Sequence, residues 1–107
     1  MSITCFKGDT FKIDITATLD DEPYWFKKGD LLKVGIKENL RNSKCGLYKK
    51  INIDEDIESV RICFTDKEMK KVCIGDKILE AELTTAEGEV FTIYQDKINI
   101  KGDVINE

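Results

Sequence analysis

The sequence predicts an all-β protein, an immunoglobulin-like antiparallel β-sandwich of about seven strands. Apolar and polar residues alternate with a period of two along most of the chain, which is the pattern of half-buried strands. Turn-forming residues separate these runs at strand-length intervals. A chain of 107 residues, 41% of them hydrophobic, is large enough to enclose one core. Alternation also serves a small barrel, so the choice between sandwich and barrel stays open.

The clearest strand runs from Phe11 to Leu19, where every odd position is apolar and every even position is polar. The same alternation predicts strands over 32–36, 60–64 and 79–83, a weaker one over 48–53, and closing strands over 90–94 and 98–100. The inward side chains of these strands are expected to share one core. Its predicted members include Phe11, Ile13, Ile15, Val34, Ile62 and Leu83.

Reversals of the chain are predicted where Gly, Asp, Asn, Ser and Pro gather, at 8–9, 20–23, 29–30, 42–43 and 87–89. Gly88 lies between two strand patterns and supplies the positive φ that a hairpin turn needs. The sequence therefore predicts a hairpin at this position.

One short helical turn is predicted near residues 66–71, because Thr65 and Glu68 have the spacing of a capping box. A single turn is unstable alone, so Met69 or Val72 must pack on the core. Residues 1–101 form the predicted sandwich domain, and residues 102–107 form a C-terminal tail.

The composition argues against two classes of partner. The net charge is −4, with 21 acidic and 17 basic side chains well mixed, so no basic face for nucleic acid is expected. No apolar run approaches the roughly 20 residues of a membrane span, and residues 1–7 lack the layout of a signal peptide. We therefore expect a protein made in the cytoplasm that binds neither nucleic acid nor membrane.

Motifs that carry chemistry are scarce. The four cysteines are scattered without C-x-x-C spacing, and the chain has no histidine, so neither a zinc site nor the usual general base is expected. No phosphate-loop, nucleophile-elbow or zinc-protease motif occurs. The acidic segment 54–58 lacks the glycine of an EF-hand loop and is expected to be solvated. We expect no enzymatic activity, no metal and no cofactor.

Three consecutive aromatic residues, Tyr24, Trp25 and Phe26, form the most informative run for binding. Neighbouring side chains of a strand point to opposite faces, so at least one of the three is expected to be exposed or to cover an edge. Two interpretations stay open: an aromatic platform for a sugar or a protein, or Trp25 filling the end of the core while its neighbours cover a loop. Tyr24, Trp25 and Tyr48 are the candidate binding residues.

The order of motifs along the chain is also informative. A Gly8-Asp9-Thr10 turn leads into the long alternating strand, a second glycine turn precedes 31–37, and a strand over 62–64 runs into the short helical turn. A closing pair of strands follows over 75–93, and 102–104 form an exit. Over nearly the whole chain, these motifs resemble in order the N-terminal domain of phage baseplate upper proteins.

That resemblance implies an immunoglobulin-like domain of a Gram-positive phage or prophage, which docks a receptor-binding apparatus onto the tail. It implies other phage tail or baseplate proteins as partners, a homo-oligomer, and a place in the virion after assembly in the bacterial cytoplasm. It brings no catalytic residues. A carbohydrate-binding β-sandwich module and a non-viral stand-alone adhesion or regulatory β-domain are the alternative functions.

Overall fold

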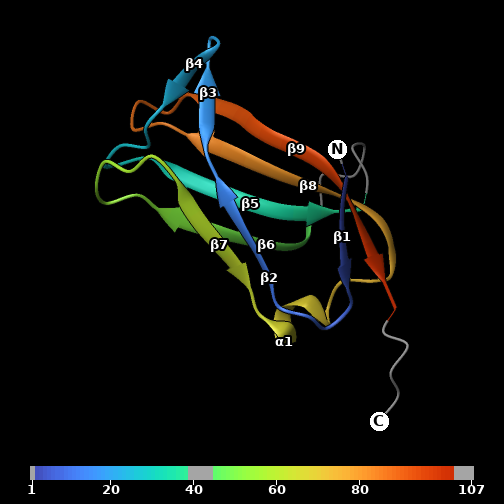
Figure 1. Cartoon of the computed structure of the whole chain (residues 1–107). Coiled ribbons are helices and arrows are strands. Elements are labelled where there is room, and N and C mark those ends of the chain that lie inside the picture. The colour runs from blue at the N-terminus through green and yellow to red at the C-terminus, as the bar shows by residue number, and fades with distance from the viewer. Residues whose placement is uncertain (1, 39–44, 103–107) are drawn as a thin grey trace.

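The computed structural model describes residues 2–38 and 45–102, which form a mostly β fold with one short helix (Figure 1). The elements in chain order are β1 (Ser2–Phe6), β2 (Phe11–Ile15), β3 (Ala17–Leu19), β4 (Glu22–Tyr24), β5 (Leu31–Lys37), β6 (Cys45–Asn52), β7 (Val60–Phe64), α1 (Asp66–Met69), β8 (Gly75–Thr84) and β9 (Val90–Lys101). The described part thus contains nine strands, where about seven were predicted.

Five of the strands form one curled mixed sheet in the order β1-β9-β8-β5-β6. Two smaller sheets have two strands each, β2 with β7 and β3 with β4. In Figure 1, β2 and β7 cross in front of the large sheet, while the β3–β4 hairpin stands at one end. The curl makes the large sheet a half-barrel rather than one flat layer of a sandwich. The predicted fold class is therefore confirmed as a mostly β architecture with one helical turn.

The prediction of a purely antiparallel arrangement is wrong at the first strand. β1 pairs with β9 in parallel, with Ile3 beside Ile98 and Cys5 beside Ile100. One side of β9 is already occupied by β8, so its other side is open to the N-terminal segment. Ile3 and Cys5 then pack against the core, and this burial favours the parallel pairing.

The predicted strand over 11–19 is divided at Thr16. Residues before it pair with β7, and residues after it form a hairpin with β4. The hairpin reverses at Asp20 and Asp21, whose φ values of 52° and 63° lie in the left-handed region that two-residue hairpin turns require. Aspartate tolerates this conformation better than most residues. Pro23 fits β4 because a two-stranded sheet leaves one side of each strand free of ladder bonds.

The core lies between the large sheet and the β2–β7 pair. Ile15, Val34, Ile62 and Leu83 are all buried, as the alternation predicted, and Phe11 stacks on Phe64 with ring centroids 6.3 Å apart. Ile13, predicted to be a core residue, is only half-buried and packs against the edge of the core.

The helical turn α1 begins with the predicted capping box. Thr65 Oγ1 accepts a hydrogen bond from the Glu68 amide at 3.3 Å, and the Glu68 carboxylate accepts one from the Thr65 amide at 3.0 Å. Met69 and Val72 are both buried, so the turn is anchored on the core as its length requires.

The closing strands form the predicted hairpin. The Thr85 amide donates to the Glu89 carbonyl, the Gly88 amide donates to the Thr85 carbonyl, and Gly88 has a φ of 88°. The strands predicted separately over 90–94 and 98–100 form one continuous strand, β9. The predicted reversal at 42–43 and residues 103–107 of the predicted tail lie outside the described residues.

Candidate functional site

The three side chains of the aromatic run Tyr24-Trp25-Phe26 lie in different environments. Phe26 is completely buried, and its backbone forms a two-way bridge with Ile57 at 2.8 and 2.9 Å. Trp25 is 54% exposed, as expected for the neighbour of an inward residue. Tyr24 is half-buried and packs edge-on against Phe26. The interpretation in which Trp25 fills the end of the core is therefore wrong, because Phe26 occupies the core there.

Tyr24 is held by a tight turn over residues 27–30. The Asp30 amide donates to the Lys27 carbonyl at 3.0 Å, and Gly29 supplies the positive φ of 98° that the turn needs. The Asp30 carboxylate is buried, and its Oδ2 accepts hydrogen bonds from the Tyr24 hydroxyl at 2.7 Å and the Lys27 amide at 3.0 Å. A buried carboxylate needs such partners, so Asp30 fixes both the turn and the tyrosine.

A polar groove of about 410 Å³ opens beside Tyr24, between the β3–β4 hairpin, the 27–30 turn and the β8–β9 hairpin. Its charged lining has four carboxylates and two lysines, and the rings of Tyr24 and Phe91 supply apolar surface. The charged residues are Asp20, Lys27, Lys28, Asp30, Glu87 and Glu89. This size and mixture can hold a small hydroxylated or cationic ligand.

The surroundings of the groove are electrically negative. Burial is the largest cause that raises the pKa of Tyr24 to about 12, and the hydrogen bond to Asp30 and the charges of Asp30, Glu87 and Asp56 raise it further. The Tyr24 hydroxyl is therefore a neutral hydrogen-bond donor at physiological pH.

Tyr48 lies on a different surface, in the outermost strand of the large sheet. Its ring is 51% exposed, with Lys33 Nζ at 4.9 Å and Lys50 Nζ at 6.0 Å from the ring centroid. Gly35 lies directly opposite Tyr48 in the register and is buried. An aromatic residue opposite a strand glycine covers the gap that the missing side chain leaves, so Tyr48 has a structural role beside any role in binding.

The structure does not join the three candidate aromatics into one platform. The ring pairs among the described residues are Phe11–Phe64 and Tyr24–Phe26, so neither Trp25 nor Tyr48 stacks on another ring there. Trp25 does not line the groove of Tyr24. Trp25 and Tyr48 are exposed, and Tyr24 contributes to a groove.

The sequence analysis missed Asp30, Lys33 and Lys50. Asp30 could have been found from the local sequence, because an aspartate in a Gly-Asp turn commonly accepts hydrogen bonds from nearby backbone amides. Lys33 and Lys50 could not have been found in this way, since their proximity depends on the register between β5 and β6.

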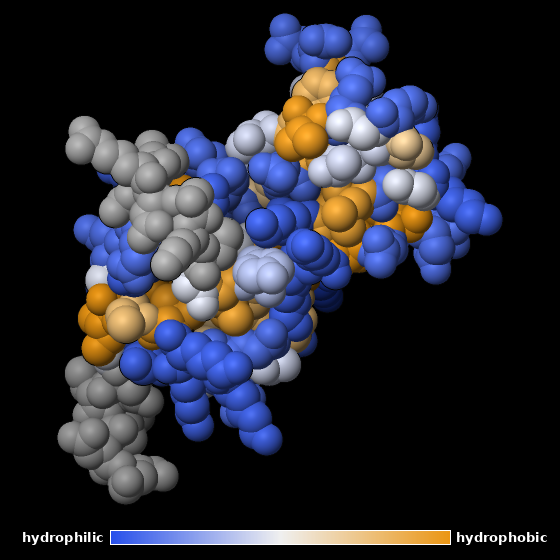
Figure 2. Space-filling model, turned by 180° about the vertical axis from the view of Figure 1, so that it is seen from behind, coloured by the Kyte–Doolittle hydropathy of each residue, from blue (hydrophilic) through white to orange (hydrophobic). Residues whose placement is uncertain are grey.

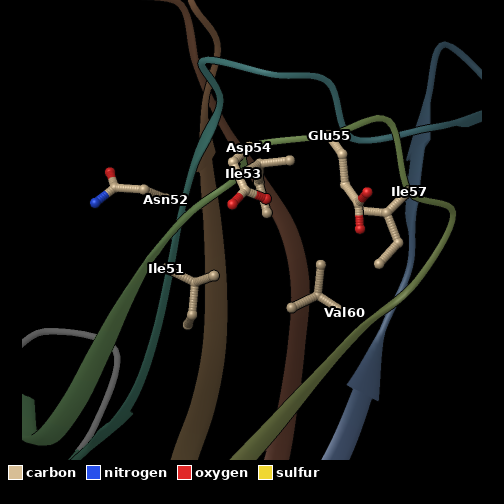
Figure 3. Close-up of a pocket in the computed structure, with 7 residues that line it drawn as sticks. All are labelled: Ile51, Asn52, Ile53, Asp54, Glu55, Ile57 and Val60. Carbon is tan, nitrogen blue, oxygen red and sulfur yellow. The ribbon is translucent and has the colours of Figure 1, made fainter.

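A smaller pocket of about 130 Å³ lies where β6 leaves the sheet and the chain turns toward β7 (Figure 3). Ile51, Ile57 and Val60 point toward one another across it, and Glu55 reaches over its rim. The acidic segment 54–58 thus borders an apolar pocket. Within residues 2–38 and 45–102, no group of three or more acidic or cysteine side chains gathers closely enough to hold a metal ion.

Other apolar side chains reach the surface singly or in small groups. Phe6, Ile74 and Val90 are 44%, 59% and 58% exposed. On the face shown in Figure 2, apolar areas are separated by hydrophilic residues rather than joined into one patch. No helix in the described part is long and apolar enough to span a membrane.

The described thiols, Cys5, Cys63 and Cys73, are free. Burial, and secondarily the charge of Asp9, raises the pKa of the Cys5 thiol, which makes it a poor nucleophile. The chain matches no protein-family model, and a search of curated proteins finds no significant match.

Proposed function

We propose that this chain is a structural protein-interaction module that acts by docking and by oligomeric contacts. The observation that carries the proposal is an open sheet edge: β6 is eight residues long and pairs only with β5 among the described strands. It carries Tyr48, an exposed aromatic residue of the kind that anchors interfaces. A long open edge is a template for another chain.

We further propose an immunoglobulin-like topology. The strand order β9-β8-β5-β6 beside the pair β2–β7 corresponds to strands G-F-C-C′ and B-E of a variable-type immunoglobulin domain. The connection between β6 and β7 crosses from the large sheet to the small one, as a C′-to-E connection does. The curl of the large sheet is the feature that departs from an aligned sandwich.

From the resemblance to baseplate upper proteins, we propose that this module belongs to a phage or prophage tail. In that role the partners are other tail or baseplate proteins and further copies of the chain, and the complex is part of the virion. Gly8, Gly29 and Gly88 each have positive φ, so these three sequence motifs are turns in the structure.

The proposal is tested by the genes that neighbour this one and by the complexes that the chain forms. Tail or baseplate genes beside the gene for this chain, and a complex with one of their products on co-expression, are the expected results. Light scattering on the isolated chain measures its oligomeric state, and Trp25→Ala and Tyr48→Ala identify which aromatic lies in the contact. A strictly monomeric chain that joins no neighbouring product would contradict the proposal.

A carbohydrate-binding function is the second candidate, and the groove of Tyr24 favours it. Two aromatic side chains and several polar groups line a space that is large enough for a monosaccharide. Binding on a glycan array that Tyr24→Ala abolishes would support this candidate. Loss on Trp25→Ala would instead assign the sugar to the exposed indole, outside the groove.

A further inference from the structure

The outer side of β6 carries backbone hydrogen-bonding groups that none of the described strands pairs with. β6 pairs with β5 over its whole length, and none of the described strands lies on its other side. Side chains from Leu47 to Asn52 alternate between half-buried and exposed, so the strand keeps a regular extended form up to its end. An extended segment of another chain could therefore continue the sheet here.

The charges on this edge are unbalanced. Lys33 of β5 lies directly opposite Lys50 of β6, and like charges at directly opposed positions destabilise a sheet. Elsewhere lysines find carboxylates: Lys37 pairs with Glu80 at 3.1 Å. Among the described residues, neither Lys33 nor Lys50 has an ion-pair partner, and both ammonium groups lie near the ring of Tyr48.

The register shows what would balance them. Across the outer face of the sheet, Glu82 of β8 is followed by Lys33 of β5 and then by Lys50 of β6. The backbone of one further strand would lie about 5 Å from that of β6, and a carboxylate on it could lie directly beside Lys50. The opposite face of β6 offers Leu47 and Ile51, which are half-buried and pack on the core.

We propose that the open edge of β6 accepts an extended acidic segment of a partner protein, added as a sixth strand. Its carboxylates would lie at alternate positions on the face of Lys33, Tyr48 and Lys50, and its apolar side chains would meet Leu47 and Ile51. The pattern of the partner is thus acidic and apolar in strict alternation. This inference rests on the proposed interaction function and names the chemistry of one partner.

A second copy of the same strand does not fit this edge as well. A copy of β6 would bring its own Lys50 toward the one already present, and lysines on an edge oppose the pairing of identical strands. The lysines that exclude a like strand are the groups that select an acidic one.

The probe is a blocked hexapeptide of alternating glutamate and valine, titrated into the full chain and followed by amide chemical shifts in two-dimensional NMR. We expect shifts concentrated over 45–52, weaker binding at high salt, and about tenfold weaker binding by Lys33→Gln with Lys50→Gln. The matched control is Lys12→Gln with Lys97→Gln, which removes two exposed lysines from other strands and should leave binding unchanged.

Three control ligands separate strand addition from simple charge attraction. A glutamine–valine peptide should bind more weakly, and a glutamate–valine peptide methylated at alternate amide nitrogens should lose binding because it cannot complete the ladder. Oligodeoxythymidylate should not compete. Equal binding of the methylated peptide, competition by the oligonucleotide, or shifts centred away from β6 would each overturn the inference.

The outcome is separable from that of the proposed function. If Lys33→Gln with Lys50→Gln leaves assembly with tail proteins intact and the peptide does not bind, the edge inference fails and the interaction function stands. If the peptide binds but the chain neither self-associates nor joins tail proteins, the edge site stands and the phage-tail function fails.

Discussion

Replacing Asp30 by asparagine should lower the pKa of Tyr24 without removing the tyrosine from its site. Asparagine keeps an oxygen that can accept from the Tyr24 hydroxyl and the Lys27 amide, but it removes the charge that disfavours the phenolate. The pKa of Tyr24 is raised from 10.0 to about 12, and burial, its largest cause, is unaffected by the substitution. We therefore expect only part of the shift to disappear, about one unit.

The assay is a spectrophotometric titration of phenolate in a background with Tyr48→Phe and Tyr94→Phe, which leaves Tyr24 as the one tyrosine that titrates. Circular dichroism at each pH verifies that the fold persists. A group with a raised folded pKa contributes stability that is complete below its unfolded pKa near 10 and is lost as the pH rises through about 12. The alkaline loss of stability should therefore begin at the same pH, near 10, in Asp30→Asn, but it should end at a lower pH and be smaller in total.

Unfolding free energies give an independent check on the same contact. Asp30→Ala removes an acceptor shared by two donors, and we expect a cost of about 2–3 kcal/mol. Tyr24→Phe removes one of these bonds and should cost about 1 kcal/mol. Tyr94→Phe is the matched control, since its hydroxyl lies 3.4 Å from Asp96 and should contribute little. A Tyr24 that titrates at its ordinary value in the native chain would refute the reasoning.

Three further predictions follow from burial, backbone conformation and capping. Phe26→Ala should cost about 3–5 kcal/mol in chemical denaturation and Trp25→Ala less than about 0.5, and similar costs would contradict their assigned burial. Gly29→Ala should lower the melting temperature more than Gly88→Ala: both have positive φ, but a Cβ at 29 would meet a neighbouring Cβ at 3.1 Å and one at 88 meets nothing within 4 Å. The hydrogen bond from the Thr65 backbone amide is the largest cause that lowers the pKa of Glu68, and Lys49 lowers it further. The contribution of Glu68 to stability is therefore present above the ordinary carboxyl pKa and is lost as the pH falls through the lowered value. In Glu68→Gln, the melting temperature should therefore fall less steeply as the pH is lowered through the acid range.

Local periodicity was sufficient to predict most of the core and the strands other than β1 and β4. Each half-buried strand carries its own period of two, so β2, β5, β7 and β8 could be located from neighbouring residues alone. The capping box at Thr65 was equally local, since its two residues lie three positions apart. The break at Thr16 escaped prediction because both halves of that run alternate in the same phase, and only their partners differ.

Pairing partners could not be predicted, because they depend on residues far apart in the chain. Nothing near Ile3 shows that it lies in parallel beside Ile98, and nothing near Lys33 shows that it lies opposite Lys50. Alternation requires Trp25 to be exposed if Phe26 points inward, as it does in the structure. The sequence alone did not decide which of the aromatic residues points inward.

The net charge illustrates the same limit on the functional side. A total of −4 gives no reason to expect a broad basic face, yet it averages over surfaces that the fold keeps apart. On the outer face of the large sheet, the carboxylates of Glu80 and Glu82 lie in a central strand, while Lys50 lies at the edge. An acidic chain can therefore present a locally positive edge, and the partner proposed for β6 would be selected by that local charge and by the backbone beside it rather than by the total.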